Sequence, residues 1–467
     1  MKQLIAILIF VTCIVTMAYG VNNFTNMSKF NKWLKSNETN YRIGCDENVS
    51  QMESEYMSEA VIQKLYKVYC FDEKNDPLWQ NEENNLEVRF YKNRWSIPYK
   101  ESPGRDTLIY YLYKYIHSHT NGDKNTMQWG KYIIQPSDAP YEFKREIKES
   151  EIVKNQMKVK PILSYLYYED GKIRIDEISP EEQFGDFIND ETKLRSNSVG
   201  KSIVSYVLGH AICNGYIENV DSKINDWPLV EGTLYENQRL IDLLNMAAGD
   251  QRIIDENNGV RGIDIDTSTI EEVMPFFQGK KPSQKGYNYN NFISPLILNY
   301  ISFKAGDDFQ LLLDKVFKEK VKIKNSVYFF KKRGKKMTKE SGNAQNMFFA
   351  SRYDYLRIAK AIMDDYQNQT CEGKYLKEIY NRKISKRIAK DDEPPFALSS
   401  SYGGQFHLDF KGLKNEIIFG MNGYGGQVIL INMTKSRIIV LNSIHFNNRR
   451  YKYDVDKLLY TPMAKGI

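Results

Sequence analysis

The sequence predicts an α+β fold, in which helices flank an antiparallel sheet and a helical subdomain is inserted between its strands. A hairpin pattern at 162–178 and a series of strand patterns after residue 400 enclose a long helix-rich stretch. Strands at both ends of a domain, with helices between them, favour one sheet that draws its strands from both ends of the chain segment.

The strand patterns are local and well defined. Two strand patterns, 162–168 and 172–178, are separated by Glu169-Asp170-Gly171. Asp-Gly is a favoured pair for a tight hairpin turn, because both residues tolerate positive φ. Further strands are expected at 402–410, 416–419, 427–432 and 437–443.

Helices are expected where apolar residues recur with the period of about 3.6 residues that one helix face requires. The longest such segment runs from Ser198 to Asn214 and should end at Gly215, since glycine readily adopts the left-handed conformation. A second, Leu240 to Ala248, should end at Gly249. Others are expected at 292–303, 309–319 and 351–366.

The chain of 467 residues is long enough for a large domain with an extension. Residues 1–20 have the basic start and apolar run of a cleaved signal peptide, and the run is shorter than the roughly 20 residues that span a membrane. We therefore expect a secreted or periplasmic protein with no stable membrane anchor after cleavage. Residues 21–145, with a helix pattern at 107–118, would form an N-terminal extension of unknown role, and 146–467 the main domain.

Charge and histidine placement exclude several classes of function. The net charge of +6 arises from 65 basic and 59 acidic side chains that are spread along the chain, so nucleic acid is not an expected partner. The densest basic run, at 332–336, is interpreted as a solvated loop. The five histidines lack metal-ligand spacing, and no CxxC, HExxH, GxxxxGK[ST] or GxSxG motif occurs. A Ser-His-Asp triad through one of the histidines is an open alternative that no motif marks, and each histidine is interpreted as structural. No metal or cofactor is expected.

Four cysteines would remain after removal of the leader. Cys45 and Cys70 could pair in an oxidising compartment, and the sequence leaves this open. Cys213 lies in an apolar helix pattern and is interpreted as a buried free thiol.

The chemistry centres on Ser198-Val199-Gly200-Lys201 at the start of the longest helix. A hydroxyl is a weak nucleophile until a base takes its proton, and a lysine three residues later on a helix lies over the same face. The helix start also offers backbone N–H groups for an oxyanion. The alternative is an N-cap serine followed by a solvent-facing lysine.

Two later segments could complete such a site. Tyr289 and Asn291 form a Tyr-x-Asn triplet just before a helix, although the same triplet occurs at three other places. Gly423-Tyr424-Gly425-Gly426-Gln427 leads into an apolar strand, and its glycines would let backbone approach a substrate closely. The alternative for this run is a simple Gly-rich hairpin turn.

Taken in order, four segments resemble the class C β-lactamase group within the serine β-lactamase and penicillin-binding-protein superfamily: 198–201, 243–249, 286–291 and 423–427. That group includes penicillin-binding esterases, D-aminopeptidases and 6-aminohexanoate-dimer hydrolases, and the Gly-Tyr-Gly-Gly-Gln run is more like the last branch. The resemblance spans roughly residues 150 to 445 and implies a β-lactamase/transpeptidase-like fold.

The resemblance also implies roles for single residues. Ser198 would attack a carbonyl, Lys201 would share or accept its proton, and Tyr289 would act as general base and acid. Asn291 would hold the substrate amide or Lys201, and the backbone N–H groups of Ser198 and Tyr424 would form the oxyanion hole. The implied reaction is hydrolysis of a small-molecule amide or ester through a covalent acyl-enzyme.

One position departs from the family pattern. Relatives have Lys or His, then Thr or Ser, then Gly, where this chain has Met421-Asn422-Gly423. Methionine offers no positive charge to a substrate carboxylate. The expected substrates are therefore amides or esters without that carboxylate, in preference to β-lactams and D-Ala-D-Ala peptides. A catalytically silent binding domain and a D-amino-acid peptidase of cell-wall peptides are the alternatives.

Overall fold

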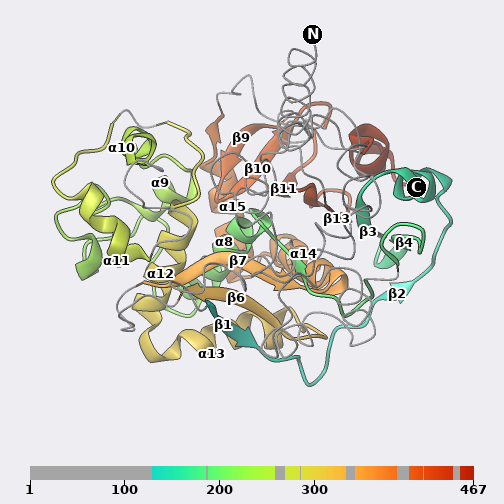
Figure 1. The fold of residues 1–467 in the computed structure, drawn as a ribbon, viewed down its shortest axis with the longest axis horizontal. Helices are drawn as coiled ribbons and strands as arrows, with labels where there is room; N and C mark the ends of the chain where they lie inside the picture. Colours follow the sequence, from blue (N-terminus) through green and yellow to red (C-terminus); the bar gives the residue numbers. More distant parts are fainter. Residues whose placement is uncertain are drawn as a thin grey trace, which may run out of the picture.

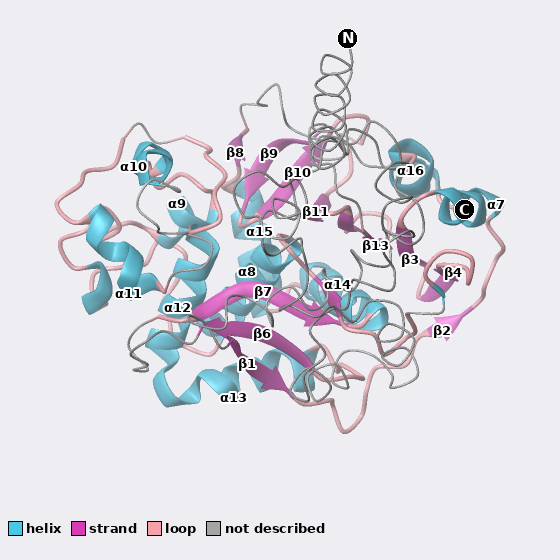
Figure 2. Ribbon diagram, viewed as in Figure 1, coloured by secondary structure: helices cyan, strands magenta, loops and turns pink. Residues whose placement is uncertain are grey.

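The computed structural model describes most of the chain from residue 129 onward, and Figure 1 shows the arrangement of its elements. Two separate sheets and a set of helices make up this part, and a group of short helices, α9 to α11, lies at one side (Figure 2). The described residues are 129–185, 188–257, 269–283, 286–332, 342–386, 399–413, 415–444 and 453–467.

The larger sheet has nine strands in the order β2-β4-β3-β13-β12-β11-β10-β9-β8. Its neighbours pair antiparallel, except that β2 and β4 are parallel. Because β3 pairs with β13, the two ends of the domain meet in the middle of this sheet, as the sequence predicts. The strands are β2 (Lys144–Arg145), β3 (Ile162–Glu169), β4 (Lys172–Ile178), β8 (Ile384–Ser385), β9 (Ser399–Gly403), β10 (Phe406–Phe410), β11 (Ile418–Gly423), β12 (Gln427–Asn432) and β13 (Arg437–Ser443).

The smaller sheet has four antiparallel strands in the order β1-β6-β7-β5. The sequence did not predict it, because β1 and β5 pair with strands far away in the chain, although β6 and β7 are consecutive. Its strands are β1 (Trp129–Ile134), β5 (Leu194–Arg195), β6 (Val327–Lys332) and β7 (Ala344–Ala350).

The helices lie mainly in the stretch between β5 and β9, with one before β3 and one at the end of the chain. The α-helices are α7 (Glu151–Val159), α8 (Val199–Cys213), α9 (Leu240–Leu244), α10 (Gln251–Asn257), α11 (Ile270–Val273), α12 (Ile293–Ala305), α13 (Phe309–Asp314), α14 (Arg352–Asn368), α15 (Cys371–Asn381) and α16 (Thr461–Lys465). Short 3-10 turns lie at Pro228–Val230, Met274–Phe277 and Gly306–Asp308, and π-helical turns at Lys315–Lys320 and Asp456–Tyr460.

The helix α8 is the central element of the core. It contacts β7 of the small sheet and β11 and β12 of the large sheet, and α12 and α15 also pack against it. Nearly every residue of α8 is buried, in agreement with its apolar sequence. A second, smaller cluster covers the opposite face of the large sheet, where residues of α7 and of the C-terminal turns pack on β3, β12 and β13.

Several expected strands are confirmed, one is shifted and one is wrong. The strand expected at 416–419 is β11, Ile418–Gly423. The hairpin of β3 and β4 turns at Asp170 and Gly171 with φ of 49° and 80°, the conformation that Asp-Gly favours. The strands β12 and β13 have the expected bounds. The expected single strand 402–410 is instead a hairpin of β9 and β10, because Gly404 and Gln405 take positive φ and reverse the chain.

The expected helices are present with shifted ends. The helix α8 ends before Gly215, whose φ of 78° confirms the expected left-handed stop. The expected helix 240–248 is too long: α9 stops at Leu244, because Met246 already takes a positive φ of 54°. The residues that follow therefore form a loop that faces the proposed site.

Residues 129–145 were expected to belong to the N-terminal extension, yet they supply β1 and β2 to the two sheets. The sheets of the main domain thus begin before residue 146. The expected signal peptide, the helix at 107–118 and the Cys45–Cys70 pair lie outside the described residues.

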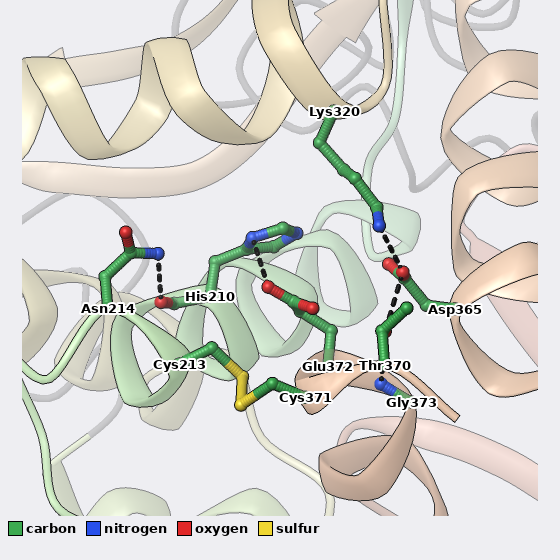
Figure 3. Close-up of a disulfide and its surroundings, with 9 residues drawn as sticks. All are labelled: His210, Cys213, Asn214, Lys320, Asp365, Thr370, Cys371, Glu372 and Gly373. Atoms are coloured by element: carbon green, nitrogen blue, oxygen red, sulfur yellow. Dashed lines mark hydrogen bonds and ion pairs between the residues drawn. A yellow bond between two sulfur atoms is a disulfide. The ribbon is translucent and has the colours of Figure 1, made fainter. Parts of the chain in front are cut away.

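The expectation of a free thiol at Cys213 is wrong. Cys213, the last residue of α8, forms a disulfide with Cys371, the first residue of α15, as Figure 3 shows. Cys213 is only half-buried and Cys371 is exposed. The two residues are 158 apart in sequence, so no local pattern could pair them.

Charged side chains support the same junction of α8 and α15 (Figure 3). His210 lies 3.2 Å from Glu372, and this hydrogen bond lowers the pKa of the Glu372 carboxyl to about 2. Thr370 donates a hydrogen bond to Asp365 and accepts one from the Gly373 N–H, which caps α15. The C-terminal end of α8 is therefore fixed by both covalent and polar contacts.

We predict that the double substitution Cys213→Ser/Cys371→Ser lowers the free energy of unfolding by about 2–5 kcal/mol, because the bridge closes a long loop in the unfolded chain. Urea denaturation of the two proteins measures the difference. A reductant should destabilise the native protein more than the variant, because the variant lacks the bridge between Cys213 and Cys371 and keeps only Cys45 and Cys70. Equal sensitivity of both proteins to reductant would contradict the prediction.

Candidate active site

The turn before α8 presents Ser198 at the mouth of the helix. Ser198 is half-buried, directly precedes the first helical residue and does not use its side chain to cap the helix. The preceding residue, Asn197, takes a positive φ of 48°, which sharpens the turn. Ser196 anchors the turn on β7, because its hydroxyl accepts a hydrogen bond from the Phe348 N–H at 2.9 Å. The hydroxyl of Ser198 is therefore not committed to capping.

The first turn of α8 lies directly against the small sheet. A Cβ added to Gly200 would meet the Asn346 carbonyl oxygen at 1.8 Å, so only glycine permits this approach. Glycine in a helix costs roughly 0.5–1 kcal/mol relative to alanine. Close packing of helix on strand explains why it is present here.

Lys201 is the buried cation of the site. Its side chain is 2 % exposed, and its Nζ donates hydrogen bonds to the Asn290 carbonyl oxygen at 3.1 Å and to Asn291 Oδ1 at 2.9 Å. Nζ also lies 5.0 Å from the centre of the Tyr289 ring. A buried ammonium is tolerated when such partners replace its water. The structure thus brings Lys201, Tyr289 and Asn291 together, and the alternative of a solvent-facing lysine is wrong.

The loop that carries Tyr289 is itself held in place. The Asn288 N–H donates to the Met246 carbonyl oxygen at 2.8 Å, and the Ser283 N–H donates to the Gly249 carbonyl oxygen at 2.9 Å. Tyr289 is 37 % exposed and Asn291 is also exposed, so both side chains are accessible, whereas Lys201 is buried. The 243–249 and 286–291 segments of the sequence analysis are thus neighbours in space.

The glycine-rich segment after β11 lies against the Ser198 turn. Asn197 Nδ2 donates a hydrogen bond to the Tyr424 carbonyl oxygen at 2.5 Å. A Cβ on Gly423 would meet the Ser196 carbonyl oxygen at 2.3 Å, so the two backbones are in direct contact. Gly425 and Gly426 then turn the chain into β12 with φ of 85° and 88°. This segment is a hairpin turn, as the alternative proposed, and it also adjoins the proposed nucleophile.

Tyr289 packs against an aromatic group that the sequence analysis missed. The Tyr402 ring meets it edge-on at 6.2 Å, and the His407 ring lies 6.5 Å away. Burial raises the pKa of Tyr402 and, with the neighbouring Lys386, holds the pKa of His407 well below its ordinary value. Tyr402 and His407 face each other across the β9–β10 hairpin, so no sequence signal could mark them once 402–410 was expected to be one strand.

Met421, the residue at the departing position, is fully buried in the core that surrounds α8. It pairs with Ile429 in the large sheet. The apolar side chain therefore serves packing and presents no charge to a substrate.

Among the described residues, no group of three or more His, Cys, Asp or Glu side chains is placed to hold a metal ion. Within the same residues, no helix combines the length and apolar character needed to cross a membrane.

Solved structures resemble this fold, although neither a family model nor a curated protein sequence matches the chain. A proposed 6-aminohexanoate-dimer hydrolase from Bacillus anthracis has a TM-score of 0.53 and 13% identity, over 76% of this chain and 92% of that one. A proposed β-lactamase from Bacteroides dorei has a TM-score of 0.46 and 12% identity, over 61% of this chain and 85% of that one. A penicillin-binding protein from Bacillus halodurans has a TM-score of 0.45 and 13% identity, over 68% of this chain and 99% of that one.

At these identities the likeness establishes the fold, and the first of the three carries that conclusion. The chain has a β-lactamase/transpeptidase-like fold, as the ordered segments of the sequence imply. What the chain does must be argued from its own residues.

We predict that Gly423→Ala destabilises the protein by about 1–3 kcal/mol, because the added methyl group would clash with backbone at Ser196. Gly286→Ala is the matched control, since a Cβ there meets nothing within 4 Å. Urea denaturation of both variants measures the effect. The prediction is wrong if both variants are as stable as the native protein.

Proposed function

We propose that this chain is a secreted serine hydrolase that cleaves an amide or ester through a covalent acyl-enzyme on Ser198. One observation carries the proposal: a buried lysine, one helical turn after an accessible serine, is held beside a tyrosine ring by residues of a distant loop. Both acceptors of the Lys201 amine belong to the loop that carries Tyr289, so the amine and the phenol ring are held together near the start of α8.

In the acylation step, Ser198 Oγ would attack the substrate carbonyl carbon. Its proton would pass to Lys201 or to the Tyr289 phenolate as the Oγ–C bond forms. The tetrahedral intermediate would then collapse, the C–N or C–O bond would break, and the same groups would return the proton to the leaving amine or alcohol. Asn291 would hold Lys201 and, from the same position, a substrate amide.

Water would complete the reaction. It would add to the acyl carbon, give its proton to Lys201 or Tyr289, and release a carboxylic acid while the proton returns to Ser198. The negative oxygen in both steps would lie at the helix mouth, near the backbone N–H groups of Ser198 and Tyr424. The contact between Asn197 and the Tyr424 carbonyl supports this pairing, because it fixes the two backbones side by side.

The buried position of Met421 narrows the proposed substrate class. It supports a small amide or ester without the carboxylate that a charged residue at this motif would bind. A buried methionine at this position argues against the D-amino-acid peptidase. A catalytically silent binding domain could have the same residue there. The labelling experiment below separates the proposed hydrolase from the silent binding domain.

The disulfide supports the extracytoplasmic location that we propose. Structural disulfides persist in oxidising compartments and are rare in the cytosol of most organisms. The bridge between Cys213 and Cys371 lies near the surface, where a reducing environment would open it.

We predict that a fluorophosphonate probe adds its mass to Ser198 and that Ser198→Ala abolishes the addition. In this reaction Oγ forms a bond to phosphorus and fluoride leaves, so a reactive hydroxyl is the only requirement. Ser205→Ala is the control, because Ser205 lies in the same helix with its hydroxyl bonded to Tyr375. Peptide mass spectrometry locates the label. An unlabelled native protein would favour the silent binding domain.

We predict that Lys201→Ala slows labelling and ester hydrolysis by about 1,000-fold or more, since a nucleophile and its base lose activity together. Lys304→Ala provides the control, because Lys304 pairs with Asp226 at the edge of α12 and should leave the rate unchanged. Rates are measured with p-nitrophenyl acetate on proteins of known melting temperature. A folded Lys201→Ala variant with a near-normal rate would refute the proposed base.

A further inference from the structure

Asp250 is a buried carboxylate behind the loop that holds Lys201. It is 1 % exposed and lies in the loop between α9 and α10. Its Oδ2 accepts a hydrogen bond from the Tyr235 hydroxyl at 2.7 Å, and Asn290 Nδ2 lies 3.4 and 3.3 Å from its two oxygens. Burying a carboxylate costs free energy unless hydrogen-bond donors surround it. A carboxylate at this position is therefore expected to have a specific structural role.

The side chain of Asn290 can take only one orientation. Its Oδ1 accepts hydrogen bonds from the Phe292 N–H at 3.0 Å and the Ile293 N–H at 3.1 Å, at the start of α12. Its Nδ2 faces the Asp250 carboxylate. A flipped amide would place a carbonyl oxygen against the carboxylate and an NH₂ group against two backbone donors, and both contacts would be repulsive.

The main chain of the same residue holds the proposed base. The Asn290 carbonyl oxygen accepts the hydrogen bond from Lys201 Nζ, and the next residue supplies the second acceptor, Asn291 Oδ1. With its side chain fixed at both ends, Asn290 has little freedom to rotate the peptide plane that carries its carbonyl oxygen, and the side chain of Asn291 extends from the other end of that plane. The contacts thus run from Asp250 through Asn290 to the amine of Lys201.

We propose that Asp250 is a positioning residue, which acts through Asn290 to set the oxygen atoms that hold the Lys201 amine at the Ser198 turn. This inference rests on the proposed function and deepens it by adding a residue that does not touch the substrate. Misplacement of a catalytic group by about 1 Å can cost roughly 100-fold in rate. Loss of the fixed position of the acceptors that hold Lys201 should therefore lower the reaction rate measurably.

Tyr235 provides the internal control for this arrangement. It donates to the same carboxylate and packs against Phe277 and Phe292, and the chain of contacts from Asp250 through Asn290 to Lys201 does not include it. Burial, with the adjacent Asp250, raises the pKa of Tyr235 well above its ordinary value, so it remains a neutral donor. Tyr235→Phe therefore removes one hydrogen bond to the Asp250 carboxylate and keeps the contacts from Asp250 through Asn290 to Lys201.

The central test is Asn290→Asp. This substitution keeps the acceptor for both backbone N–H groups at the start of α12 and replaces the donor that faces Asp250 with a second carboxylate oxygen. We expect the maximal rate of fluorophosphonate labelling of Ser198 to fall about 10- to 100-fold, while the half-saturating probe concentration changes less than about threefold. The double variant Asp250→Asn/Asn290→Asp restores a donor opposite an acceptor and should recover most of the rate.

Two further variants guard against simple loss of folding. Asp250→Ser removes the carboxylate and leaves Asn290 intact, and it should show the same fall in maximal rate. Tyr235→Phe should lower the melting temperature yet keep the labelling rate within about threefold of the native protein. Native-like labelling by Asn290→Asp or Asp250→Ser overturns the inference, and so does a double variant that regains stability without regaining rate.

The outcome for Asp250 is distinguishable from the outcome for the proposed function. If the native protein carries no label at Ser198, the hydrolase proposal itself fails. If the native protein is labelled and Asn290→Asp is labelled equally fast, only the positioning role fails.

Discussion

The burial of the Lys201 ammonium is the constraint on which the rest of this site depends. An amine removed from water must find acceptors within the protein, and here they are the Asn290 carbonyl and Asn291 Oδ1. Both belong to a loop almost ninety residues further along the chain, with separations of 89 and 90. That requirement ties the start of α8 to the loop before α12. Tyr289 belongs to the same loop, so its ring lies beside the Lys201 amine.

Close backbone contacts make the rest of the site possible. Gly200 brings the first turn of α8 against β7, and Gly423 brings the end of β11 against the turn before α8. At the opposite end, the disulfide and the pair of His210 and Glu372 fix α8 to α15. The helix is therefore held at both ends, and the residues at its mouth have little freedom to drift.

Local patterns predicted what local chemistry decides. The Asp-Gly hairpin, the left-handed stop at Gly215 and the strands at 427–432 and 437–443 follow from turn preferences and from the spacing of apolar residues. The small sheet was missed because two of its strands, β1 and β5, pair across long separations and because its strand sequences mix apolar with polar residues. Cys213 was misjudged for the same reason, since its partner lies far away in the chain.

By itself, the sequence determined the class of fold and the segments that carry the candidate chemistry: the Ser-x-x-Lys helix start, the Tyr-x-Asn loop and the glycine-rich hairpin. Only the tertiary structure decided which side chains surround them, such as His407, Tyr402 and Asp250. The physical reason is that turn and periodicity signals are short-range, whereas a buried amine, carboxylate or ring is stabilised by whichever groups the folded chain places within hydrogen-bond or packing distance.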